Sequence, residues 1–303
     1  MQISTSLFYD TTTSLMQKLS QHADALNTQI STGKRLAQPS DDVVAYRRLA
    51  AIAQANGYGT AYSGNIKLAQ SLLQQSDSVL GSVDTQLQRA KELTIQASTG
   101  TLNDADRKAI ATELRSIRDD LAGLANTQDA RGQPLFAAAD GNTAVIQAAD
   151  GSVSFAGTGT PAAIPVADNV SVQPTESAAR VFGGVPSGAS TTDVFALLGT
   201  FADALDAGGD ISTAAKVAND GVAAASTQVA AVRGSLGARA TRLDLEATRN
   251  TDAAAARETD RSSLEDTDVT AAITELQKTM TTLQATQASF TKLSSLSLFD
   301  YLK

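Results

Sequence analysis

The side chains of this chain that could carry out chemistry are a few carboxylates and one histidine. His22 is the only histidine and cysteine is absent, so the sequence offers no histidine cluster, no thiolate and no Ser-His-Asp or Cys-His arrangement. Clustered carboxylates could act as acid and base or hold a hard cation. Three such clusters occur, at Asp41-Asp42, Asp119-Asp120 and Glu265-Asp266-Asp268.

Each acidic cluster also has a simpler explanation, because each lies at or beside a predicted helix as a cap or a solvated face. His22 falls on an apolar helical stripe, where a packed or interface histidine is far more common than a catalytic one. Gly33-Lys34 lacks the second glycine and the Ser/Thr of a phosphate-binding loop. We therefore predict no enzyme, no cofactor and no metal site, with Ser-Lys or carboxylate chemistry assembled in space as the remaining enzymatic alternative.

The composition favours long helices in a structural protein. The 303 residues carry 24 Lys+Arg against 32 Asp+Glu, a net charge of -8 that argues against a nucleic-acid or anionic-membrane surface. Hydrophobic residues make up 42%, but only 4% are aromatic and much of the rest is alanine, which suits closely packed helices. There is no signal-peptide pattern and no stretch that could cross a bilayer, so composition alone is typical of a soluble cytosolic protein.

The stretch from 264 to 303 has the strongest periodicity in the sequence and is predicted to be a helix. Residues at alternating steps of four and three form a heptad stripe, and no proline or glycine interrupts it. The stripe comprises Val269, Ile273, Leu276, Met280, Leu283, Gln287, Phe290, Ser294 and Ser297. A helix with one apolar stripe is marginal alone in water, so this one needs a partner.

The other end of the chain carries a matching pattern. Phe8, Leu15, Leu19, His22, Leu26 and Ile30 fall on one helical stripe, and Gly33 can serve as a left-handed C-cap. We expect the two terminal helices to pair as a coiled coil with each other or with other subunits. The predicted assembly interface comprises Leu15, Leu19, His22, Leu26, Ile30, Val269, Ile273, Leu276, Met280, Leu283 and Phe290.

The segments between the ends predict a long antiparallel helical bundle. Heptad-like stripes run over 66–97 and 110–124, the second with Asn103 as N-cap, and the short break between them should fold the two helices antiparallel. Helical patterns return over 193–205 and 211–247, and Asp210 is a suitable cap. Gly234 and Gly237 interrupt the last stripe, which suggests either close approach of another backbone or a poor local choice that packing overrides. The alanine-rich composition favours the first explanation.

A small β module is predicted between the helical halves. From about 131 to 192 the chain is rich in Gly, Pro, Ser, Thr and Val, with four of its six prolines. Residues 144–147 and 152–155 flank Asp150-Gly151, a hairpin signal, and Val170 and Val172 alternate with polar neighbours as in a strand. The fold class is therefore mainly α with a small inserted β module.

Three motifs resemble those of the bacterial flagellin superfamily. The first is Ile30-Ser31-Thr32-Gly33-Lys34-Arg35 followed by Pro39-Ser40-Asp41-Asp42, where Pro39 should end the helix, Ser40 should cap the next, and the acidic pair should lie in its first turn. The second is Val232-Arg233-Gly234-Ser235-Leu236-Gly237-Ala238-Arg239, similar to the return-helix motif. The third is Leu264-Glu265-Asp266-Thr267-Asp268, similar to the acidic turn before the last helix.

Within the superfamily, the two ends resemble the hook-associated protein 3 branch more than flagellin. These ends are Met1-Gln2-Ile3-Ser4-Thr5-Ser6 and Leu296-Ser297-Leu298-Phe299-Asp300-Tyr301-Leu302. Flagellin itself, or more remotely a non-flagellar coiled-coil structural protein, is the alternative. The two flagellar hypotheses share both stripes and differ in whether assembly is limited.

The resemblance implies an organisation and a set of partners. Residues 1–40 with 264–303 would form the inner assembly layer, 41–134 with 193–263 the helical bundle, and 135–192 an outer β-rich domain. Family members are exported unfolded through the type III channel with a chaperone on the C-terminal helix, and they contact hook-associated protein 1 and flagellin as a homo-oligomeric ring. An extracellular flagellar location without a cleavable signal peptide follows from that resemblance.

Overall fold

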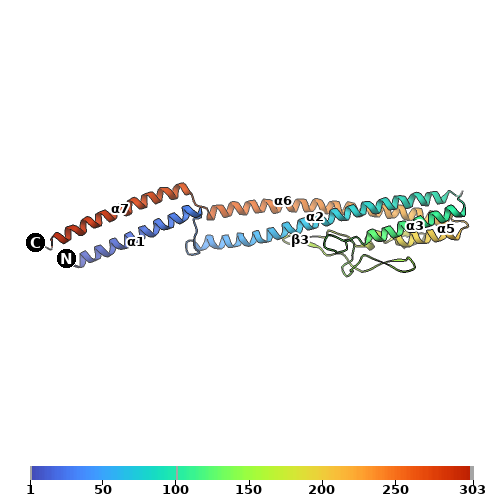
Figure 1. Cartoon of the computed structure of the whole chain (residues 1–303), viewed down its shortest axis with the longest axis horizontal. Helices are drawn as coiled ribbons and strands as arrows, with labels where there is room; N and C mark the ends of the chain where they lie inside the picture. Colours follow the sequence, from blue (N-terminus) through green and yellow to red (C-terminus); the bar gives the residue numbers. More distant parts are fainter. Residues whose placement is uncertain (1, 100–101, 301–303) are drawn as a thin grey trace. The chain divides into compact units, whose positions relative to one another are not determined.

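The computed structural model describes residues 2–99 and 102–300, with side chains described over 7–99 and 102–292 (Figure 1). Its described part is mainly helical with small β hairpins, as predicted. The helices are α1 (Gln2–Thr32), α2 (Val43–Ser98), α3 (Asp104–Ala125), α4 (Ala178–Phe182), α5 (Val194–Ala207), α6 (Ser212–Glu265) and α7 (Val269–Asp300). The strands are β1 (Val145–Gln147), β2 (Val153–Phe155), β3 (Ile164–Ala167), β4 (Val170–Val172), β5 (Val185–Ser187) and β6 (Ser190–Thr192).

The chain divides into two compact units. The terminal unit comprises Met1–Tyr58 and Asp252–Lys303, and the central unit comprises Gly59–Thr251. Helices α2 and α6 contribute to both units. The three-part division drawn from the sequence, with a separate outer β domain, stays a prediction.

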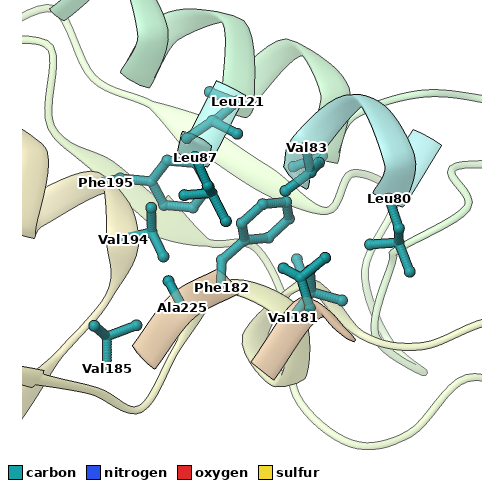
Figure 2. Packing of buried hydrophobic residues seen from close by; sticks show 14 of the residues in the cluster. Leu80, Val83, Leu87, Leu121, Val181, Phe182, Val185, Val194, Phe195 and Ala225 are labelled. Carbon is teal, nitrogen blue, oxygen red and sulfur yellow. The ribbon is translucent and has the colours of Figure 1, made fainter. Parts of the chain in front are cut away.

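The hydrophobic core lies in the central unit. Leu80 and Leu87 of α2, Leu121 of α3 and Phe195 of α5 are almost completely buried in one cluster (Figure 2). Phe182 of the short helix α4 enters the same cluster, with its ring centroid 5.1 Å from that of Phe195. Burying such side chains supplies most of the free energy that stabilises a helical bundle.

Polar contacts between α2 and α3 establish their antiparallel arrangement. Arg89 Nε donates to Glu113 at 2.7 Å, and Gln86 Nε2 donates to Asp120 at 3.3 Å. As the residue number falls along α2, the partner's number rises along α3. The predicted fold-back is therefore confirmed, and α3 packs in turn along α5.

The β residues form three separate two-stranded antiparallel hairpins rather than one sheet. The predicted hairpin around Asp150-Gly151 is confirmed as β1 paired with β2, and the predicted strand at Val170–Val172 is β4. Asn126, which ends α3, holds the first hairpin in place. Its Oδ1 accepts the backbone N–H groups of Ala144 and Val145, both at 3.0 Å, and its Nδ2 donates to the carbonyl of Val145.

Most predicted helix ends are confirmed, with one error. Asn103 accepts the N–H of Asp106, Asp193 caps α5, and Gly33 adopts a left-handed φ of 70° after α1. The prediction that Ser40 caps the second helix is wrong. Asp42 Oδ1 accepts the N–H groups of Val44 and Ala45, so the acidic pair precedes the helix instead of occupying its first turn.

The expectation that another part of the chain approaches α6 closely at Gly234 and Gly237 is also wrong. A Cβ added at Gly234 or Gly237 would have no atom within 4 Å, so neither glycine allows a close approach. Gly221 of the same helix does allow one. A Cβ there would lie 2.5 Å from Leu197 Cδ2 and 3.1 Å from the Pro186 carbonyl oxygen.

These glycines give a matched prediction for alanine substitutions. Gly234→Ala and Gly237→Ala should each stabilise the protein by ~0.5–1 kcal/mol, because alanine restricts the unfolded chain and favours helix. Gly221→Ala should instead destabilise it by ~1–3 kcal/mol through overpacking against a buried leucine and a backbone carbonyl. Urea unfolding of the three variants measures both signs, and a stabilised Gly221→Ala would contradict the close packing.

Candidate assembly interface

The two terminal helices pair in the terminal unit, as predicted. Helices α1 and α7 run side by side in opposite directions (Figure 1). Near one end the rings of Tyr9 and Phe290 meet edge to face, with centroids 5.2 Å apart. Near the other end the N–H of Thr267 donates to the carbonyl of Gly33 at 3.0 Å.

The residues that pack between α1 and α7 follow alternating steps of three and four on both helices, as in a coiled coil. On α1 they are Tyr9, Thr12, Met16, Leu19, Ala23, Leu26 and Ile30, and on α7 they are Ala272, Leu276, Thr279, Leu283, Thr286 and Phe290. Leu26, Ala23 and Ala272 are buried and most of the others are half-buried. We call this set the packed stripe.

Only part of the predicted interface lies in the packed stripe. Six of its residues do: Leu19, Leu26, Ile30, Leu276, Leu283 and Phe290. The other five lie beside it with exposed side chains: Leu15, His22, Val269, Ile273 and Met280. The exposed residues form two flanks of the pair and remain candidates for contacts with other chains, whereas Ser294 and Ser297 lie outside the described side chains.

The first and third sequence motifs meet each other where the terminal helices join α2 and α6. Arg35 donates its backbone N–H to the carbonyl of Glu265 at 2.7 Å and its Nη2 to the carbonyl of Leu264 at 2.8 Å. Lys34 Nζ lies 2.5 Å from Glu265 Oε1, and Lys34 also forms an isolated antiparallel bridge with Asp266. The two connecting segments therefore bind each other through backbone and side chain together.

The remaining residues of the first motif shape the connecting segment itself. The hydroxyl groups of Ser31 and Thr32 both bond the carbonyl of Thr28 in the last turn of α1. Asp41 Oδ2 accepts the N–H groups of Ala37 and Gln38, closing a turn around Pro39. Together with the cap from Asp42, these bonds satisfy backbone groups that would otherwise be left open between two helices.

The charges at this connection lower the pKa of its central carboxyl group. The pKa of Glu265 lies below its ordinary 4.5, first because of the hydrogen bond from Lys34 and then because of that from Arg261. Arg261 also bonds Glu258, and the pKa of Glu258 falls for the same reason. The pKa of Arg261 rises beside these carboxylates.

This shift predicts that acid loosens the connection. A carboxyl group with a depressed folded-state pKa contributes stability above its unfolded value, here 4.5, and loses that contribution as pH falls through the folded-state pKa. Below the folded-state pKa of Glu265, the amides of Arg35 and Thr267 should lose about fivefold of their protection from hydrogen exchange. This loss corresponds to ~1 kcal/mol, the scale expected for a partly exposed ion pair. In Glu265→Gln the same two amides should already have low protection at neutral pH. If their protection still fell with pH as in the unmodified chain, Glu265 would not be the group responsible.

The second motif lies in the central unit and faces α2 and the loop before α4. Arg233 Nε donates to Asp77 Oδ1 of α2 at 2.8 Å, Leu236 is buried, and Gly237 faces open space. Arg239 pairs with the buried carboxylate of Glu176 and donates to the carbonyl of Gln173 at 2.9 Å. The motif therefore ties α6 to its neighbours.

The acidic clusters act as caps and bridging acceptors. Asp119 accepts hydrogen bonds from Arg118 and from Gln147 of β1, and Asp268 caps α7 through the N–H groups of Thr270 and Ala271. Within 2–99 and 102–300, no group of three or more histidine, cysteine, aspartate or glutamate residues could hold a metal ion. No helix in those ranges has the length and apolar character needed to span a membrane.

Comparison with known proteins agrees with the three motifs. Residues 3–140 match the bacterial flagellin N-terminal helical region, and residues 220–302 match the bacterial flagellin C-terminal helical region. A flagellar hook-associated protein 3 of Escherichia coli K12 is 30% identical over 291 residues, which cover 91% of each chain. The chain belongs to the flagellar hook-associated protein 3 family. It is therefore a structural protein of the flagellin superfamily and not an enzyme.

Solved structures of other flagellar proteins share the fold of this chain. A flagellar hook-associated protein of Vibrio parahaemolyticus aligns with a TM-score of 0.67 at 20% identity, covering 75% of this chain and all of that one. The flagellar junction protein FlgL of Legionella pneumophila aligns with a TM-score of 0.61 at 16% identity, covering 72% and 100%. At these identities the structures establish the fold alone.

Flagellins are also related, over a shorter stretch. A flagellin of Listeria monocytogenes is 30% identical over 130 residues, 42% of this chain and 44% of its own length. The hook-associated protein 3 of Escherichia coli extends over more than twice that length at the same identity. The similarity that continues through the central part therefore favours the hook-associated branch.

Proposed function

We propose that this chain forms the junction between the hook and the filament of the bacterial flagellum, as an adaptor between hook-associated protein 1 and flagellin. The observation that carries the proposal is the 30% identity to a hook-associated protein 3 along 91% of both chains. The terminal helix pair supports it, because its exposed apolar flanks suit a protein whose ends are covered by neighbouring subunits.

The proposal includes a route and an assembled state. The chain is exported unfolded through the flagellar type III channel, with a chaperone on α7 before assembly, and it then forms a homo-oligomeric ring outside the cell. The long helices of the terminal unit suit this route, since each is one continuous segment that can re-form its own helix within microseconds after export. The described part of the chain holds no disulfide that would have to form on arrival, because the sequence has no cysteine.

Complementation in a flagellated bacterium that lacks its own hook-associated protein 3 tests the proposal. Such cells should make hooks without filaments, and expression of this chain should restore filaments, with the tagged chain at the hook's distal end by immunogold electron microscopy. A chain distributed along the whole filament would show that it acts as flagellin. Hooks that stay bare although the chain is exported would contradict the junction role.

Sedimentation of the purified chain separates the two flagellar alternatives in solution. A junction protein should give assemblies of limited size as protein concentration and ammonium sulfate are raised. Unlimited polymerisation into fibres under the same conditions would favour flagellin. Both measurements use the full chain.

A further inference from the structure

The sulfur atoms of this chain are confined to its terminal unit. The sequence has three methionines and no cysteine. The methionines are Met16, Met280 and Met1, of which the last lies outside the described residues. Residues 59–251 of the central unit contain no methionine, cysteine, tryptophan or histidine. In a chain without cysteine, the methionine thioether is the group that peroxides oxidise most readily, so oxidation should leave the central unit unmodified.

Met16 and Met280 differ in their surroundings. Met280 of α7 is 41% exposed, so an oxidant can reach its side chain while the helices are paired. Met16 of α1 is half-buried in the packed stripe. The rings of Tyr9 and Phe290 are in contact, and counting seven residues inward from both along the antiparallel helices places Met16 level with Leu283. Of the two methionines, only Met16 therefore belongs to the contact between the helices.

We infer that Met16 is an oxidation-sensitive site, at which conversion of the thioether to the sulfoxide by a peroxide separates α1 from α7 and leaves the central unit folded. With hydrogen peroxide, the sulfur attacks one oxygen, and the S–O bond forms as the O–O bond breaks. The other oxygen leaves as water with both hydrogens. The sulfur is oxidised by two electrons and the peroxide is reduced by two. The inference goes beyond the proposed function, because it concerns how the helix pair responds to an oxidant.

A sulfoxide at Met16 would find the neighbouring hydroxyl groups already in use. Its oxygen is a hydrogen-bond acceptor, and burying an acceptor without a donor is unfavourable. Thr12, one turn from Met16 on α1, donates its hydroxyl to the carbonyl of Phe8 at 2.8 Å. Thr286 of the stripe on α7 donates to the carbonyl of Thr282 at 2.8 Å. The sulfoxide must therefore displace one of these bonds, stay unsatisfied or turn out of the stripe toward water, and each outcome weakens the contact.

Met280 provides the contrasting case on the same helix pair. Its side chain is exposed while the helices are paired, so a sulfoxide there can be hydrated without disturbing the packed stripe. Met280 should therefore react first and without effect on pairing. Met16 should react more slowly, at a rate that depends on how often the pair opens.

Peroxide treatment of the purified full chain, followed by hydrogen exchange, tests the inference. Mass spectrometry of peptides measures the sulfoxide at each methionine. Once Met16 is oxidised, the amides of 7–32 and 269–292 should lose protection roughly tenfold, the scale of one unsatisfied acceptor, while those of α3 and α5 keep theirs. Reduction by the two methionine sulfoxide reductases, one for each sulfoxide epimer, should restore the protection.

Two conservative variants separate the methionines. Met16→Leu keeps an apolar side chain of similar volume and should retain its protection through the same treatment. Met280→Leu should lose protection as the unmodified chain does. Loss of protection in oxidised Met16→Leu, which still carries Met1 and Met280, would overturn the inference. Full protection in the unmodified chain with Met16 oxidised would overturn it too, as would a Met16 that stays reduced under peroxide that oxidises it in the urea-unfolded chain.

A polar substitution gives a second readout that needs no oxidant. Met16→Gln places an amide in the packed stripe and should show the lowered protection directly, whereas Met280→Gln should behave as the unmodified chain. Equal protection in the two glutamine variants would contradict the role of Met16. All these measurements use the purified chain without a flagellar partner, so a failure of the unmodified chain to restore filaments would concern the proposed function alone.

Discussion

Replacing Leu283 with aspartate is expected to abolish assembly while the central unit stays folded. Leu283 lies in the packed stripe between α1 and α7, so an aspartate there would bury a charge without a partner. The free energy that pairs the two helices would be lost, because an isolated helix of this kind is marginal in water. Residues 59–251 keep their own core, from Ile66 to Leu243, in which Leu283 has no part.

Hydrogen exchange and thermal melting measure the two parts of this prediction separately. In Leu283→Asp the amides of 7–32 and 269–292 should exchange freely, while those of α3 and α5 keep their protection. Gln284→Asp, exposed next to it on the same helix, is the matched control and should keep both the protection and the assembly. A large fall in the melting temperature of the soluble monomer would contradict the separation of the two units.

Phe290→Asp extends the same expectation to the far end of the pair. It would remove the edge-to-face contact with the ring of Tyr9 and place a charge beside it. The effect on assembly should match that of Leu283→Asp. The effect on protection should be concentrated in the first turns of α1, because the contact lies there.

The heptad pattern predicted the terminal helices correctly but marked only part of the stripe that packs between them. Two neighbouring stripes on one helix have the same alternating spacing of three and four residues. A reading based on hydrophobicity therefore picks the stripe with the larger apolar side chains. In the pair, Thr12 and Ala23 occupy contact positions where small side chains let the helices approach, while Phe8 and Leu15 remain outside. Large exposed apolar residues next to a packed stripe therefore shift the periodic signal away from the residues that pack.

The segment from Val43 to about residue 65 is helical although its sequence has no periodic apolar pattern. It belongs to α2, yet its side chains are mostly exposed or half-buried and it contains Gly57 and Gly64. Without an apolar face there is no periodic signal, and the helix depends on continuity with the buried stripe that begins at Ile66. The prediction favoured Ser40 as the cap and placed Asp42 in the first turn, whereas Asp42 caps the helix.

The contacts that hold the short helix α4 to α6 could not be found from the sequence. Gln228 of α6 donates from one amide group to the carbonyls of Arg180 and Gly183, about 45 residues away, at 2.6 and 2.8 Å. A single polar residue carries no periodicity, and its partners are backbone atoms that any sequence would offer. Strands of three or four residues likewise give too few alternations to distinguish three hairpins from one sheet.

Replacing Arg239 with alanine is expected to destabilise the central unit by ~3–5 kcal/mol, the usual cost of removing one partner of a buried ion pair. Glu176 is 3% exposed and accepts a hydrogen bond from Arg239 Nη2, while Arg180, which also lies near it, has a largely exposed side chain. The same guanidinium group donates to the carbonyl of Gln173. Arg239→Ala would therefore leave a buried carboxylate short of its donor and a backbone acceptor unsatisfied.

A double substitution decides whether this loss comes from the orphaned charge or from the packing of the loop. Arg239→Met with Glu176→Met removes both charges and keeps apolar volume, so it should recover at least half of the lost stability in urea unfolding. Arg233→Ala is the matched single control, because its partner Asp77 is about half exposed, and it should cost ~1 kcal/mol or less. Equal losses for Arg239→Ala and Arg233→Ala would contradict the argument, since Arg239 has a buried carboxylate and a backbone carbonyl as partners and Arg233 has a half-exposed carboxylate.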